Sequence, residues 1–203
     1  KYGFIDKSGK VVIEPQFDEV RDFSEGLAKV EKDGKWGYID KNGKVVIEPQ
    51  FNDAEPFSEG FACVEKDGKW GFIDKSGKVV IELQFDRVRD FSEGLAQVLV
   101  WPDTWGYIDK NGKVVIEPQF DDACAFSEGL ARVKKEDKWG FIDKNGKVVV
   151  EPQFDDAEPF SEGLAKVEKD GKYGFIDKNG KVVIEPQFDD AGAFSEGLAK
   201  VQR

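Results

Sequence analysis

Short runs of apolar residues, separated by turn-forming residues, fill the chain, and their pattern returns about every 34 residues. In residues 35–40 (KWGYID), two aromatic rings lie on one face of an extended strand and Ile39 lies on the other, because successive side chains of a strand point to opposite faces. Residues 44–48 (KVVIE) again carry apolar side chains on both faces. No segment shows sustained helical periodicity, so the pattern predicts an all-β chain of antiparallel hairpins.

Two turn sequences separate the predicted strands. DKNGK could form a type I′ turn with Asn42 at positive φ, but other copies have serine at this position, which favours a type I turn closed by a left-handed glycine. The Asp67-Gly68 pair predicts a second tight hairpin, from strand 61–66 into the next copy. Residues 51–60 are expected to form a loop pinned by aromatic side chains, with a short fourth strand inside it.

The pattern divides the chain into six repeats with nothing left over. Repetition at this period is typical of solenoids, propellers and arrays, in which one unit cannot bury a core alone. We therefore expect a single repeat domain over residues 1–203. Its copies are residues 1–34, 35–68, 69–103, 104–137, 138–171 and 172–203.

The first two strands of each copy are apolar on both faces, which predicts that each sheet is covered on both sides. A closed ring of six small sheets, as in a six-bladed β-propeller, provides this arrangement. Pairing of residues 1–6 with residues 198–203 would close the ring and remove two exposed strand edges. An open β-solenoid is the alternative.

Two aromatic positions recur in every copy and are predicted to be buried and structural. Truncation of a buried Phe to Ala costs about 3–5 kcal/mol, so these positions should contribute much of the stability. The first set is Tyr2, Trp36, Trp70, Trp105, Trp139 and Tyr173, and the second is Phe23, Phe57, Phe91, Phe126, Phe160 and Phe194.

Composition limits the partners. The 41 acidic and 30 basic residues give a formal net charge of −11, which disfavours nucleic acid and anionic membranes and favours a basic ligand. No apolar run is long enough to span a membrane and no segment is signal-like, so we expect a soluble chain of unassigned location. The chain has no Met, which indicates a fragment or a processed domain.

Catalytic chemistry is poorly supported. The absence of His removes the usual general base, the commonest metal ligand and every His-dependent triad. The recurrent acids Asp40, Glu48 and Asp53 are explained as turn and surface residues, and the DKNG turns lack the further ligands of a calcium loop. We expect no enzyme activity, no metal site and no cofactor.

Two cysteines are present, at positions that vary between copies. Other copies have Lys, Gln or Arg in place of Cys63, and Glu, Gly or Arg in place of Cys124. These residue types predict solvent-exposed positions, and alternate units of a ring do not touch. We therefore expect two unpaired cysteines without a function.

One turn breaks the repeat pattern. At the end of the third copy, EKDGK is replaced by LVWPDT, which is one residue longer and brings Leu99, Val100 and Trp101 where other copies carry charge. An exposed Trp could anchor a partner, because aromatic residues are enriched at binding hot spots. The alternative is that the turn folds back onto its own sheet. Arg87 and Arg89 are a second candidate for binding, with solvated charge as the alternative.

The WGF or WGY motif, IDK-x-GK and the later FSEGLA together resemble the bacterial WG repeat family, also called KWG repeats. The resemblance covers all six copies, and the full KWG stands at residues 35–37, 69–71 and 138–140. Tyr2 and Tyr173 replace the Trp in two copies, and Thr104 replaces the Lys in a third. The resemblance implies a β-rich repeat domain, often part of a larger bacterial protein, with an interaction role and no catalytic residue.

The sequence leaves three functions open. A monomeric module that binds a protein or peptide predicts one site, lost on Trp101→Ala. A lectin-like binder of glycans, as in a cell envelope, predicts several equivalent weak sites. An engineered or recently amplified scaffold predicts no ligand at all.

Overall fold

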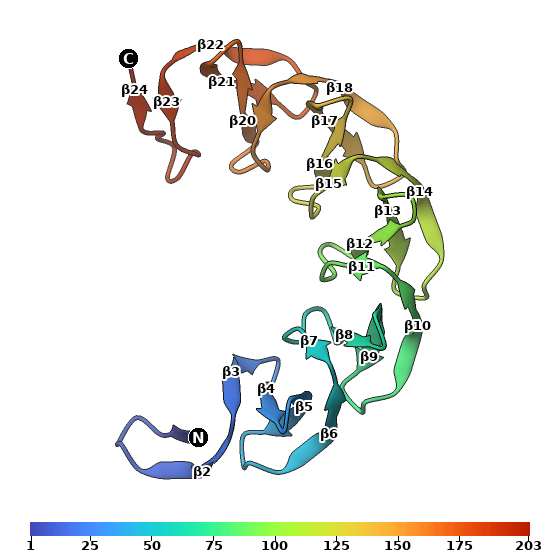
Figure 1. Ribbon diagram of the computed structural model, residues 1–203. Helices are drawn as coiled ribbons and strands as arrows, with labels where there is room; N and C mark the ends of the chain where they lie inside the picture. The colour runs from blue at the N-terminus through green and yellow to red at the C-terminus, as the bar shows by residue number, and fades with distance from the viewer. The chain divides into compact units, whose positions relative to one another are not determined.

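The computed structural model describes all residues from Lys1 to Arg203 and contains 24 strands and no helix (Figure 1). This confirms the all-β prediction. The strands belong to two compact units, which are described separately. Unit 1 contains Lys1–Phe91 and Lys110–Gly112, and unit 2 contains Ser92–Asp109 and Lys113–Arg203.

Unit 1 contains two antiparallel four-stranded sheets, which we call blades. The first blade is formed by β3 (Glu19–Ser24), β4 (Leu27–Lys32), β5 (Lys35–Asp40) and β6 (Val45–Phe51), and the second by β7 (Asp53–Ala54), β8 (Phe61–Lys66), β9 (Lys69–Asp74) and β10 (Val79–Phe85). A two-stranded sheet, β1 (Tyr2–Ile5) and β2 (Val11–Phe17), precedes them, and β11 (Arg87–Val88) follows.

Unit 2 repeats the same order of strands. It contains the antiparallel strands β12 (Leu95–Val100), β13 (Thr104–Asp109) and β14 (Val114–Phe120), followed by a blade of β15 (Asp122–Ala123), β16 (Leu130–Lys135), β17 (Lys138–Asp143) and β18 (Val148–Phe154). The next blade is β19 (Asp156–Ala157), β20 (Leu164–Lys169), β21 (Lys172–Asp177) and β22 (Val182–Phe188), and the last sheet is β23 (Asp190–Ala191) with β24 (Val201–Gln202).

Each complete blade takes its strands from two repeats. β7 and β8 end one repeat, β9 and β10 begin the next, and the Asp67-Gly68 hairpin joins them. Asp67 (φ 55°) and Gly68 (φ 79°) both have the left-handed conformation that a type I′ turn requires. β7 is the short fourth strand that the sequence predicted within residues 51–60.

The DKNG turns have the predicted geometry. Gly43 is left-handed (φ 81°) and its amide donates to the Asp40 carbonyl oxygen at 3.0 Å. The Asp40 carboxylate accepts the amides of Asn42 and Lys44 at 2.9 and 3.0 Å. Asn42 does not have a positive φ, so the side chain of Asp40 and the glycine, rather than a left-handed asparagine, define the turn.

The glycine of each WG pair lies where two strands of a blade come very close. The register between β5 and β6 shifts between Trp36 and Tyr38, on either side of Gly37. A Cβ on Gly37 would lie 2.5 Å from the carbonyl oxygen of Ile47 and 2.6 Å from the nitrogen of Pro49. Only glycine fits this position without moving backbone.

The hydrophobic core lies between successive blades. In unit 1, Trp36, Tyr38 and Phe51 of the first blade pack with Phe57 and Val64 of the second. The rings of Tyr38 and Phe57 are 4.9 Å apart and nearly perpendicular, an arrangement that aromatic quadrupoles favour. Unit 2 repeats it, with a 5.0 Å spacing between Tyr107 and Phe126. The apolar faces of one blade are therefore covered by the next.

Burial differs between the first two strands of a copy. Tyr38 and Ile39 point to opposite faces of β5 and are both fully buried, as the sequence predicted. The same prediction is wrong for β6, where Val46 is 38% exposed and Glu48 is also exposed. The reason is that β6 is the last strand of the blade, so only part of its side chains reach the neighbouring blade.

Most predicted structural aromatics lie in these cores. Trp36, Trp105, Phe57, Phe91, Phe126 and Phe160 are buried, and Trp70, Trp139, Tyr173, Phe23 and Phe194 are half-buried. The burial predicted for Tyr2 is not found, since this side chain is 57% exposed. Tyr2 belongs to the two-stranded sheet β1–β2, which lacks the strand that covers the equivalent ring in a complete blade.

The FSEG sequence links each blade to the next, and we call this set of contacts the FSEG clasp. In unit 1, the Ser24 hydroxyl donates to the Phe57 carbonyl oxygen at 2.7 Å, and the Gly60 amide donates to the Glu25 carboxylate at 3.0 Å. Lys75, from the DKSG turn of the second blade, pairs with the same carboxylate at 3.1 Å. Equivalent bonds in unit 2 join Ser127 to Phe160, and Glu128 to Gly163 and Lys178.

Candidate interaction site

The turn that breaks the repeat connects β12 to β13, and we call Leu99–Thr104 the tip segment. Val100 pairs with Thr104 at the end of the hairpin, as Lys66 pairs with Lys69 in the second blade. Three residues separate the first pair and two separate the second. The Asp103 amide donates to the Val100 carbonyl oxygen at 3.0 Å and closes the longer turn.

The tip segment exposes its tryptophan. Trp101 is 85% accessible to solvent, the most exposed large apolar side chain of the chain. Leu99 instead packs against the core cluster that contains Trp105, and Val100 is half-buried. The strand end is therefore anchored by Leu99, and the following turn presents Trp101 to solvent rather than folding it back onto the sheet.

The two arginines that the sequence singled out lie in unit 1, whereas the tip segment lies in unit 2. Arg87 is exposed on β11 and Arg89 is half-buried. The candidate site is therefore built from residues of unit 2 alone.

One acidic residue near the tip segment was missed by sequence reasoning. Asp121, which directly follows β14, accepts the Glu136 amide at 2.8 Å. In other repeats the equivalent aspartate also pairs with the lysine that opens KWG, as Lys69 does with Asp86 at 2.6 Å. Thr104 stands in that lysine's place here. The replacement of that lysine by Thr104 was the only sign in the sequence that Asp121 differs from its equivalents.

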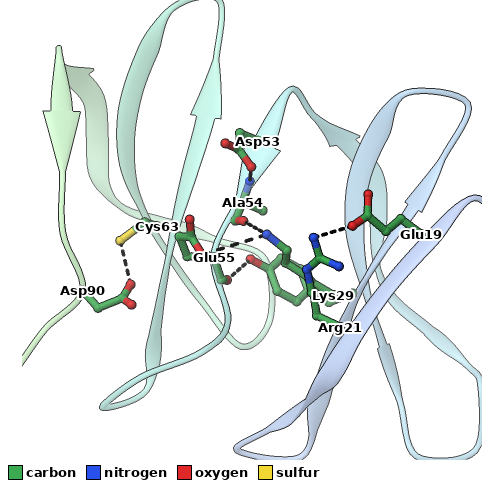
Figure 2. Close-up of polar contacts among 9 residues, drawn as sticks. Glu19, Arg21, Lys29, Asp53, Ala54, Glu55, Cys63 and Asp90 are labelled. Atoms are coloured by element: carbon green, nitrogen blue, oxygen red, sulfur yellow. Dashed lines mark hydrogen bonds and ion pairs between the residues drawn. The ribbon is translucent and has the colours of Figure 1, made fainter.

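A second set of polar contacts lies between the two blades of unit 1 (Figure 2). The Lys29 ammonium donates to the Ala54 carbonyl oxygen of the next blade and lies 3.9 Å from the Glu55 carboxylate. It also lies 4.4 Å from the centre of the Trp36 ring. Lys29 is only 7% exposed, so these contacts replace the water that it loses on folding. Burial raises the pKa of Glu55, against the opposing effect of Lys29.

Cys63 occupies the position equivalent to Lys29 and is 1% exposed, so the prediction of a solvent position is wrong. The Lys and Gln of other copies are misleading because the side chain at this position points between blades, where Lys29 and Gln97 are buried too. Burial, and secondly the Asp90 carboxylate at 3.1 Å, raise the pKa of the Cys63 thiol well above its usual value. A protonated buried thiol is a poor nucleophile and metal ligand.

Cys124 lies elsewhere, half-buried in unit 2, where its sulfur accepts a hydrogen bond from Arg132 Nε at 3.2 Å. Both cysteines are free, as predicted.

No group of three or more Cys, Asp or Glu side chains is arranged to hold a metal ion. A hollow of about 260 Å³ beside the β16–β17 turn is lined by Lys135, Glu136, Lys138, Glu151 and Pro152, a mixture of both charges.

Comparisons with solved structures identify the fold. BamB from Moraxella catarrhalis is 10% identical, with a TM-score of 0.51 over 96% of this chain and 70% of BamB. A eukaryotic initiation factor is 13% identical, with a TM-score of 0.58 over 87% of this chain and 56% of that protein. Hsv2 of Kluyveromyces lactis is 14% identical, with a TM-score of 0.50 over 78% and 58% of the two chains. These similarities show a β-propeller-like fold and nothing of function.

No curated protein is detectably similar to the sequence. The structure has no helix that is long and apolar enough to cross a membrane.

A protein family matches nearly the whole chain, in six consecutive copies described as the WG containing repeat. The matches cover residues 2–36, 36–70, 70–100, 105–139, 139–173 and 173–203. Residues 101–104, within the tip segment, fall between two matches, so the tip departs from the family pattern as well as from the other copies. The chain belongs to the family of WG-containing repeats.

Proposed function

We propose that this chain is a non-catalytic module that binds a protein or peptide partner through the tip segment. The observation that carries the proposal is the 85% exposure of Trp101 in a turn that lies between two of the six family matches. The other four Trp side chains are buried or half-buried between blades. An exposed Trp on a short hairpin is the kind of residue that forms the centre of a binding hot spot.

The setting of Trp101 also favours binding. β12 and β13 are paired over their full length, and Leu99 fixes the end of β12 in the core. The turn is therefore held by a rigid hairpin, so little conformational entropy is lost when a partner binds. Propeller-like repeat folds commonly act as interaction scaffolds, which agrees with this arrangement.

Equivalent glycan sites in every repeat are not favoured. Such sites need exposed aromatic platforms, and the ring that opens the repeat is exposed only in the first copy, at Tyr2. In the five later copies, from Trp36 to Tyr173, it is buried or half-buried. The tip segment occurs once, which instead favours one site per chain.

The first test selects peptides from a random library displayed on phage against the full chain. Peptides are then titrated against the chain and against Trp101→Ala, with Lys66→Ala as the matched change at the equivalent hairpin end. Loss of a hot-spot residue costs at least about 2 kcal/mol, so Trp101→Ala should weaken binding at least about 30-fold while Lys66→Ala leaves it unchanged. Equal binding by the chain and Trp101→Ala contradicts the proposal.

A further inference from the structure

A lysine–aspartate pair recurs at the head of the repeats and has a fixed geometry. The lysine that opens the first strand of the repeat reaches Oδ1 of the aspartate that follows the second strand. Oδ2 of the same aspartate accepts a backbone amide from the next hairpin along the chain. In unit 2, Lys138 pairs with Asp155 in this way, and the Asp170 amide donates to Oδ2 at 2.8 Å. The other pairs are Lys1–Asp18, Lys69–Asp86 and Lys172–Asp189.

The fourth repeat keeps the acceptor and lacks the cation. Oδ2 of Asp121 accepts the Glu136 amide at 2.8 Å, as Oδ2 of Asp18 and of Asp155 accept the equivalent amides, so the carboxylate is held in the same orientation. Thr104 replaces the lysine, and its short side chain carries no charge. Asp121 is exposed and has no ion pair. Lys134, whose carbonyl oxygen accepts the Asp121 amide, directs its ammonium to Asp137 instead. The fold thus presents a positioned carboxylate whose usual partner is missing.

Thr104, which stands in place of the lysine, and the exposed Trp101 belong to the same hairpin. Position 104 directly follows the turn formed by Trp101, Pro102 and Asp103. A lysine at this position in other repeats reaches the aspartate, so Asp121 lies within one side-chain length of the base of the turn. Asp103 is exposed in the turn and adds a second negative charge. A carboxylate is suited to a lysine or arginine side chain, through a charge-assisted hydrogen bond, and an exposed tryptophan is suited to apolar side chains of the same partner.

We infer that the partner is a basic segment whose lysine or arginine side chain binds Asp121 in place of the missing lysine, while its apolar residues contact Trp101. This inference rests on the proposed function and specifies the chemistry of the partner. The formal net charge of −11 favours the same kind of partner, because it attracts basic segments over the whole surface.

The test supplies Asp121 with a cation from the chain itself. Thr104→Lys restores the residue that the other repeats have, so its ammonium should occupy Asp121 and compete with the partner. Thr104→Gln is the matched control, since it adds a side chain of similar length without charge. The probes are the phage-selected peptides and versions of them in which each lysine or arginine is replaced by glutamine.

We expect the selected peptides to contain lysine or arginine, and Thr104→Lys and Asp121→Asn to weaken their binding about 10-fold or more. Thr104→Gln should have little effect, and binding should weaken as salt concentration rises. Unchanged melting temperatures of the variants exclude a loss of fold as the cause.

The possible failures are distinguishable. Peptides that depend on Trp101 but lack a basic residue, or that bind Thr104→Lys as well as the unchanged chain, overturn the inference and leave the proposed function standing. Selection of no peptide that discriminates against Trp101→Ala overturns both. A dimer in sedimentation experiments that Trp101→Ala abolishes identifies a second copy of the chain as the occupant, and also overturns the inference.

Discussion

Gly37 is needed because of a contact that is distant in the sequence. Nothing in the KWGYID string demands glycine, since an alternating strand accepts a side chain at that position. The requirement comes from the backbone of β6, which passes within 2.5–2.6 Å of the place of a Cβ. The sequence could therefore predict the strand and its aromatic residues but not the reason for the glycine.

Gly37→Ala should lower the free energy of unfolding by about 1–3 kcal/mol, because the added methyl group must push apart two paired strands. Urea unfolding followed by fluorescence measures the effect. Gly192→Ala is the control: Gly192 does not have a positive φ, and its nearest neighbour would be 3.8 Å from the new Cβ. Equal stability of the two variants would show that the close approach does not carry a cost.

The position shared by Lys29 and Gln97 shows another limit of sequence reasoning. Long polar side chains usually indicate solvent, yet both are buried between blades. Lys29 donates to a carbonyl oxygen of the next blade, whereas Nε2 of Gln97 has no hydrogen-bond partner. Whether the buried side chain finds a hydrogen-bond partner depends on the facing blade, so it cannot be predicted from the sequence of one repeat.

Opposite effects are expected from the same change at these two residues. Gln97→Met removes an unpaired buried amide and should raise the free energy of unfolding by about 1 kcal/mol. Lys29→Met leaves the Ala54 carbonyl and Glu55 without their cation and should lower it by about 1–3 kcal/mol. Thermal unfolding of both variants checks the signs, and a loss of stability in Gln97→Met contradicts the first expectation.

Among the elements, the hairpins were the most predictable. The DKxG and DG turns follow from local chemistry, and the short strand β7 was expected from the need for a fourth strand. The FSEG clasp was only partly predictable. A left-handed glycine, as at Gly60 (φ 89°), is ordinary in a turn, but Glu59 is left-handed too (φ 51°), a conformation that glutamate rarely adopts. Contacts with neighbouring blades hold such residues, so no local rule could indicate them.

The FSEG clasp makes stability depend on pH. A hydrogen bond from Lys178 and the amide of Gly163 lower the pKa of Glu128 below its usual value of about 4.5. Because the folded-state pKa is the lower one, the charged clasp stabilises the fold fully above about pH 4.5. This contribution is lost as the pH falls through the folded-state value.

Unfolding measured from neutral to acid pH should therefore show a steeper acid loss of stability for the unchanged chain than for Glu128→Gln. Glu185→Gln, which changes an exposed carboxylate of β22, is the control and should keep the steep loss. If Glu128→Gln follows the same pH curve as the unchanged chain, the clasp carboxylate does not contribute.

At the scale of the whole molecule, the repeat architecture and the all-β class were predictable because six copies report the same pattern independently. Closure into a ring, with an open solenoid as the alternative, stays a prediction that small-angle scattering can test. The tip segment was found because it breaks the pattern, whereas Asp121 was missed because it keeps the pattern. Asp121 itself is unchanged, but the lysine that would pair with it is replaced by Thr104.

The division of each complete blade between two repeats bears on how such a chain can change its length. Unequal crossing-over between copies adds or removes whole multiples of the repeat, wherever the exchange falls. Every new junction then joins the end of one copy to the head of another through a hairpin, and the FSEG residues meet equivalent neighbours. The unit of duplication in the gene therefore differs from the unit of folding. An in-register exchange still yields complete blades, because each copy's end again meets the head of a following copy.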